Sequence, residues 1–130
     1  MTGVQTGALP IGLLHLRNTQ ADQFEKVHTA FGLGEWLNKK LCGVRTIDPS
    51  QASGSGLYSL TEDDWCWDLI DAMGLPRDIF PQITNAGTLL GELGTAAANH
   101  LGLAAGLPVG MGGADTQGAL LGAGVISSGR

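Results

Sequence analysis

The chain has little of what builds disulfide-rich, metal-binding or nucleic-acid-binding proteins. Its 130 residues include only two cysteines, Cys42 and Cys66, which are too few for a disulfide framework and lack the spacing of a metal site. Seven basic residues against twelve acidic ones give a net charge of −5, and Lys39-Lys40 is the only basic pair. This balance disfavours a nucleic-acid or an anionic-membrane partner.

Long hydrophobic runs are missing as well. No apolar run approaches the roughly 20 residues that span a bilayer, and the N-terminus lacks the charged start of a signal peptide. The two cysteines resemble ordinary cytosolic thiols, so we expect a cytoplasmic protein. A content of 43% hydrophobic and 15% charged residues indicates a folded domain with a buried core.

Glycine, in contrast, is abundant, and the most informative glycines lie near the C-terminal end. The chain has 21 glycines, and Gly112-Gly113 follow a short apolar run. Asp115 then precedes an Ala/Leu/Gly segment with helical spacing. This pattern predicts a strand, a tight glycine turn and a helix, with one carboxylate at the junction. Glycine permits a sharp turn and the close approach of a ligand because it carries no Cβ.

Two interpretations of Asp115 follow from this pattern. A carboxylate at such a junction suits a general base or a metal ligand. Alternatively, Asp115 is only a helix N-cap, a position where aspartate is favoured.

The preceding chain predicts helices first and then short strands that alternate with helices, which is an α/β pattern. Asp48–Ser53 is predicted as a turn, in which Asp48, Ser50 and Ser53 bond to the backbone. Asp64 and Thr95 are the expected caps of the helices that follow them. The predicted helices are 10–17, 21–30, 33–41 (ended by Gly43), 65–73 (ended by Gly74) and 96–101 (ended by Gly102), with strands at 57–60 and 88–93 and one helical turn between Pro76 and Pro81.

Other catalytic motifs are not found in the sequence. Gly110-Met-Gly112 begins like a dinucleotide fingerprint, but Asp115 occupies the position of its third glycine. Phosphate loops and nucleophile elbows are absent. The histidines are isolated, which disfavours a zinc site. The three tryptophans are predicted to lie in the core or at its edge.

Three segments, taken in order, carry a family resemblance. The first is Leu13–Arg17 with the helix pair through Leu41-Cys42-Gly43. The second is Asp48–Ser53 with Gly56-Leu57-Tyr58, Trp65 and the helix end Leu69–Pro76. The third is Gly112-Gly113-Ala114-Asp115-Thr116-Gln117. Together they resemble the N-terminal domain of the FGGY-family carbohydrate kinases.

This resemblance implies a fold and an activity. Family members have two actin-like, ribonuclease-H-like α/β domains around a cleft, and they transfer the γ-phosphoryl group of ATP to a sugar or polyol. The resemblance implies that Asp115 is the catalytic base and lies close to Mg²⁺. It also implies that Gly113, Thr116 and Gln117 bind the substrate. Thr116 stands where the family commonly has Gln or Asn, so the substrate itself is left open.

The resemblance also predicts what the chain does not contain. The family's N-terminal Asp-Gly-(Thr/Ser) hairpin, its Gln/Trp-Asp-x-Arg stretch and its ATP-binding domain are not in the sequence. We therefore expect residues 10–130 to be an incomplete N-terminal kinase domain that is inactive alone, and residues 1–9 to be an unmatched segment. The alternative hypothesis is a non-catalytic α/β interaction module in which Asp115 is only a helix cap.

Overall fold

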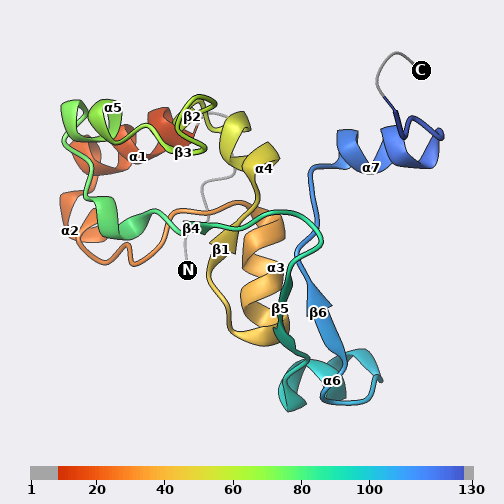
Figure 1. Cartoon of the computed structure of the whole chain (residues 1–130). Helices are drawn as coiled ribbons and strands as arrows, with labels where there is room; N and C mark the ends of the chain where they lie inside the picture. Colours follow the sequence, from red (N-terminus) through yellow and green to blue (C-terminus); the bar gives the residue numbers. More distant parts are fainter. Residues whose placement is uncertain (1–8, 128–130) are drawn as a thin grey trace.

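A computed structural model describes residues 9–127, so residues 1–8 of the segment that was predicted to be unmatched lie outside the described residues (Figure 1). Among the described residues, no helix is both long and apolar enough to cross a membrane. The helices are α1 (Leu9–Thr19), α2 (Ala21–Phe24), α3 (Leu33–Cys42), α4 (Pro49–Gly54), α5 (Trp67–Ala72), α6 (Thr95–Leu101) and α7 (Asp115–Gly122), with a 3-10 turn η1 (Arg77–Ile79). The strands are β1 (Thr46–Ile47), β2 (Tyr58–Ser59), β3 (Asp64–Trp65), β4 (Gln82–Ile83), β5 (Leu89–Glu92) and β6 (Pro108–Gly110).

The strands form three short pairs. β1 and β4 are parallel, with Thr46 opposite Gln82, whereas β2–β3 and β5–β6 are antiparallel. The hydroxyl of Thr46 strengthens the parallel pair by donating to the carbonyl of Gln82 at 2.8 Å. The mixture of parallel and antiparallel pairs with intervening helices agrees with the predicted α/β class.

The main core lies where α1, α4, α5 and η1 meet the first strands. Trp65 is at its centre, 1% exposed, and its indole N–H donates to the carbonyl of Pro81 at 2.8 Å. The ring of Phe80 packs against Trp65 at 5.1 Å between centroids. Trp67 is half-buried and packs against this core, so the prediction is right for Trp65 and Trp67. It is wrong for Trp36, which is 38% exposed and lies outside the core cluster. The other buried members are Leu13, Ala30, Ile47, Ala52, Leu57, Ile70, Leu75 and Ile79.

The predicted helix 21–30 is wrong in length, because α2 ends at Phe24. After Phe24, the backbone forms hydrogen bonds with other segments of the chain. The N–H of Ala30 donates to the carbonyl of Ile79 at 2.7 Å, and Arg45 donates to the carbonyl of His28 at 3.0 Å. These tertiary bonds replace the helical ones that the apolar spacing had suggested.

The segment Asp48–Ser53 is also different from the prediction, since it begins a helix rather than forming a turn. Asp48 is the N-cap of α4, and its side chain accepts from the N–H groups of Ser50 and Gln51. Pro49 occupies the first helical position, where a missing N–H costs nothing. The side-chain-to-backbone bonding expected of Asp48 is therefore present, but it serves a helix start.

The two predicted caps are wrong, whereas the predicted helix ends are right. Asp64 lies in β3, and Cys66 is the residue that precedes α5. Thr95 is the first residue of α6, and Gly94 holds the cap position. The glycines after α3, α5 and α6 have positive φ angles, as helix-ending glycines should; they are Gly43 (80°), Gly74 (64°) and Gly102 (69°).

Candidate active site at the start of helix α7

Asp115 is the first residue of α7, which the chain reaches from β6 through residues 111–114. The N-cap position belongs to Ala114, whose backbone is extended with φ −62° and ψ 155°. The interpretation of Asp115 as the N-cap is therefore wrong. Its carboxylate is exposed, and one oxygen accepts from the N–H of Thr116 at 2.7 Å. Asp115 thus satisfies one free N–H of the helix start while its carboxylate remains open to solvent.

The predicted sharp glycine turn is not what the backbone shows. Neither Gly112 nor Gly113 is among the glycines with positive φ angles. A Cβ at Gly112 would have open space, and one at Gly113 would lie 3.8 Å from the Cβ of Gln117 and 3.9 Å from the Cβ of Ala86. These are ordinary contacts, so the local fold does not itself require glycine at either position.

Thr116 and Gln117 follow Asp115 in the first turn of α7. Both are exposed, and the Thr116 hydroxyl donates to the side-chain oxygen of Gln117 at 2.7 Å. The predicted site residues Gly113, Asp115, Thr116 and Gln117 are therefore grouped on one exposed helix start.

Ser50 joins this group from a distant part of the sequence. Its hydroxyl oxygen accepts from the N–H of Ala114 at 2.9 Å, across a separation of 64 residues. The same hydroxyl donates to Asp48, which is 3% exposed. The prediction that Ser50 bonds to the backbone is correct, but its partner lies outside its own turn, and no local pattern in the sequence identifies it.

A second buried carboxylate, that of Glu35, is close enough to Asp48 for the two charges to interact. Glu35 in α3 is 2% exposed, and one of its carboxylate oxygens accepts from the N–H of Gly32 at 2.8 Å. Burial raises the pKa of Glu35, two backbone hydrogen bonds lower it in part, and the charge of Asp48 raises it further. Glu35 and Asp48 are thus structural carboxylates, in contrast to the exposed Asp115.

Asp115 offers a carboxylate, the ligand type that magnesium uses in phosphoryl-transfer sites. Within residues 9–127, no three His, Cys, Asp or Glu side chains are grouped to hold a metal. Mg²⁺ in kinase sites is usually held by one or two carboxylates together with substrate phosphates and water. A single exposed carboxylate at Asp115 is compatible with that mode of binding.

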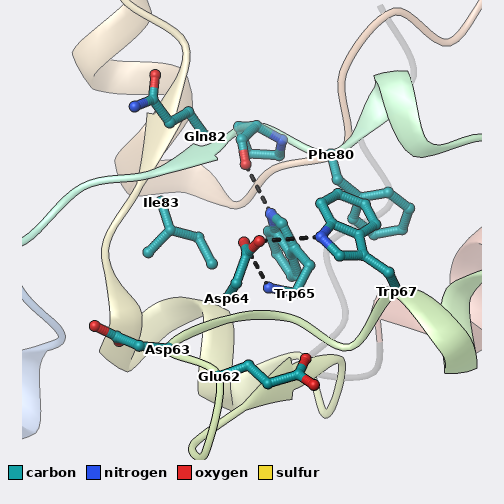
Figure 2. Close-up of a pocket in the computed structure, with 9 residues that line it drawn as sticks. Glu62, Asp63, Asp64, Trp65, Trp67, Phe80, Gln82 and Ile83 are labelled. Carbon is teal, nitrogen blue, oxygen red and sulfur yellow. Dashed lines mark hydrogen bonds between the residues drawn. The ribbon is translucent and has the colours of Figure 1, made fainter.

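A hollow of about 640 Å³ lies elsewhere, between β3, α5 and β4 (Figure 2). Figure 2 shows the carboxylate of Asp64 hydrogen-bonded to two tryptophans: it accepts from the backbone N–H of Trp65 at 2.7 Å and from the indole N–H of Trp67 at 3.0 Å. These groups are paired with one another, which indicates a structural role. None of the predicted site residues lines the hollow, which is formed by Glu62, Asp63, Asp64, Trp65, Trp67, Phe80, Pro81, Gln82 and Ile83.

Known proteins are similar to this chain in both sequence and fold. The sequence model of the FGGY family of carbohydrate kinases, N-terminal domain, matches residues 2–122. The autoinducer-2 kinase of Klebsiella pneumoniae is 41% identical over 118 residues, which are 91% of this chain and 22% of that protein. The autoinducer-2 kinase of Escherichia coli K12 is 40% identical over 114 residues, or 88% of this chain and 22% of that protein. The chain therefore spans about a fifth of the length of these relatives.

Solved structures give the same result for the fold. The xylulose kinase of Rhodospirillum rubrum superposes with a TM-score of 0.87 at 28% identity, over 98% of this chain and 26% of that one. The glycerol kinase of Plasmodium falciparum superposes with a TM-score of 0.79 at 15% identity, over 91% of this chain and 24% of that one, which shows the fold alone. The prediction of a partial actin-like α/β domain is confirmed. By sequence and by fold, the chain belongs to the FGGY family of carbohydrate kinases.

Proposed function

We propose that the chain is part of an ATP-dependent kinase that phosphorylates a hydroxyl of a sugar or polyol, with Asp115 as the general base. The observation that carries this proposal is the exposed carboxylate of Asp115 at the first residue of α7. Membership of a carbohydrate kinase family supports the reaction class. A small-molecule substrate and a cytoplasmic location are part of the same proposal.

The chemistry requires one proton acceptor and close positioning. The oxygen of the substrate hydroxyl bonds to the γ-phosphorus of ATP, the bond between that phosphorus and the β–γ bridging oxygen breaks, and ADP leaves. The hydroxyl proton passes to the carboxylate of Asp115. Such transfers depend mainly on positioning and on charge stabilisation. The N-terminus of α7 favours the negative charge that an acceptor carboxylate needs.

The neighbouring residues have supporting roles in this proposal. Asp115 would hold Mg²⁺ together with the phosphates of ATP, and the bound ion would neutralise phosphate charge. Thr116 and Gln117 present polar side chains to the substrate from the same helical turn. Gly113 leaves room for a substrate to approach the backbone, which gives a reason for a glycine that the fold itself does not need.

The test is Asp115→Asn in the complete kinase chain that contains this segment. Asparagine keeps an oxygen for the N–H of Thr116 but cannot accept the proton. Loss of a general base costs about 100-fold or more in turnover. We expect a loss of that size with ATP binding and thermal stability retained, measured with autoinducer-2, xylulose, gluconate and glycerol as acceptors.

Asp22→Asn is the matched control, since Asp22 is an exposed acid in the first turn of α2. It should leave turnover unchanged. Parent-like turnover of Asp115→Asn would contradict the base role. Absence of ATP-dependent phosphorylation of every acceptor would instead favour the non-catalytic interaction module.

A further inference from the structure

We infer that Ser50 is a positioning residue that fixes the start of α7 and thereby the direction of the Asp115 carboxylate. The inference rests on the proposed role of Asp115 as the base. Its physical basis is the 2.9 Å hydrogen bond from the N–H of Ala114 to the Ser50 hydroxyl, which joins the starts of α4 and α7. Ser50 therefore acts on the residue immediately before Asp115.

The Ser50 hydroxyl is itself held firmly. Asp48 accepts from both the N–H and the hydroxyl of Ser50, the former at 2.9 Å. Asp48 is buried and directly follows β1, which is paired with β4. Because the hydroxyl proton points at a carboxylate, a lone pair of the Ser50 oxygen is free to accept. In a chain of hydrogen bonds each bond polarises the next, so this oxygen is a better acceptor.

Ala114, whose N–H donates to Ser50, is also the N-cap of α7. Its carbonyl accepts from the N–H groups of Gln117 at 3.1 Å and Gly118 at 3.2 Å, and so begins the helical pattern of α7. The N–H groups at a helix start have no partner within the helix. The bond to Ser50 therefore ties the beginning of α7 to a separate, buried part of the molecule.

The remainder of α7 contributes little to its orientation within the described residues. Every residue from Asp115 to Gly122 is exposed, and Figure 1 shows α7 standing away from the other helices. Among the described residues, those that lead into α7 are therefore the ones that set its direction. A misplacement of about 1 Å at a catalytic group can cost about 100-fold in rate.

The test compares three Ser50 variants in the complete kinase chain. Ser50→Ala removes the acceptor, and we expect kcat to fall by about 10- to 100-fold while KM for ATP stays within about twofold. Ser50→Thr keeps the hydroxyl and should restore kcat. Ser50→Cys supplies a weaker acceptor and should give an intermediate kcat, which keeps the test decisive if the alanine variant does not fold. Ser53→Ala, an exposed serine on the same helix, should behave as the parent.

A second comparison separates positioning from a general structural role. If Ser50 acts through Asp115, then Ser50→Ala should change the residual kcat of Asp115→Asn by less than about twofold. An equal loss in both backgrounds, or a cysteine or alanine variant with parent kcat, would overturn the inference. Should Asp115→Asn itself retain parent turnover, the proposed function fails; should it lose turnover while Ser50→Ala does not, the inference alone fails.

Discussion

The hydroxyl of Ser50 and the backbone N–H of Ala114 form a 2.9 Å hydrogen bond that links two helix starts 64 residues apart. Through it, a buried cap at Asp48 is connected to the exposed carboxylate of Asp115. The exposed catalytic candidate is thus attached to one of the most buried polar groups in the described chain.

Replacing Asp48 should destabilise the fold. Asp48→Ala leaves the N–H groups of Ser50 and Gln51 without their acceptor at a buried helix start. We expect a loss of about 1–3 kcal/mol in the free energy of unfolding. Denaturant titration measures it, and Asp48→Asn is the control because asparagine caps almost as well as aspartate. Equal stability of the alanine and asparagine variants would show that the cap does not hold α4.

Replacing Gly113 should affect activity more than stability. A Cβ there makes only ordinary contacts of 3.8–3.9 Å, so Gly113→Ala should change stability by about 0.5 kcal/mol or less. In the complete kinase chain the added methyl group should raise KM for the sugar, because it lies beside Gln117, which the proposal assigns to substrate binding. Gly43→Ala is the contrasting control: its φ of 80° predicts a loss of about 1–2 kcal/mol. A parent-like KM in Gly113→Ala would refute the close approach of substrate.

Burial of Glu35 should make stability depend on pH. Burial raises the pKa of Glu35 above the ordinary value of 4.5, so the folded state holds this proton more tightly than the unfolded chain. The stabilising effect of the proton is fully present below pH 4.5 and is lost as the pH rises through the raised pKa.

The variant Glu35→Gln isolates this contribution, since glutamine keeps an oxygen for the N–H of Gly32. The free energy of unfolding of the parent should fall relative to the variant between acidic and neutral pH. Denaturant titrations at a series of pH values measure the difference, with Glu62→Gln as an exposed control. A difference that does not change with pH would contradict the prediction.

The isolated 130-residue chain should associate through exposed apolar side chains. An apolar groove between α3 and α6 includes Trp36, Leu37 and Leu101, of which Leu37 is 49% and Leu101 51% exposed. Exposed apolar side chains that lie together favour association. Sedimentation velocity should show oligomers whose fraction rises with protein concentration. The substitution Leu37→Lys should lower that fraction. A monomer that unfolds sharply and independently of concentration would be the contrary result.

Helix ends and the candidate base were predictable because their signals are local. Gly43, Gly74 and Gly102 end their helices through a backbone conformation that glycine tolerates best. Asp115 stands out because a single carboxylate follows a glycine pair at the start of an Ala/Leu segment. The length of α2 was not predictable, because Ala30 gives its N–H to Ile79, a partner 49 residues away in the sequence, rather than to a helical carbonyl.

The sequence by itself determined the α/β pattern, the family and the grouping of Asp115, Thr116 and Gln117 on one helical turn, because these follow from residues close in the chain. Only the tertiary structure decided that Asp48 caps a helix and that Ala114, not Asp115, is the N-cap of α7. It alone placed Ser50 against Ala114. That contact requires β1 and β4 to pair and the chain to return through β6, and hydrogen bonds formed between distant segments leave no local pattern in the sequence.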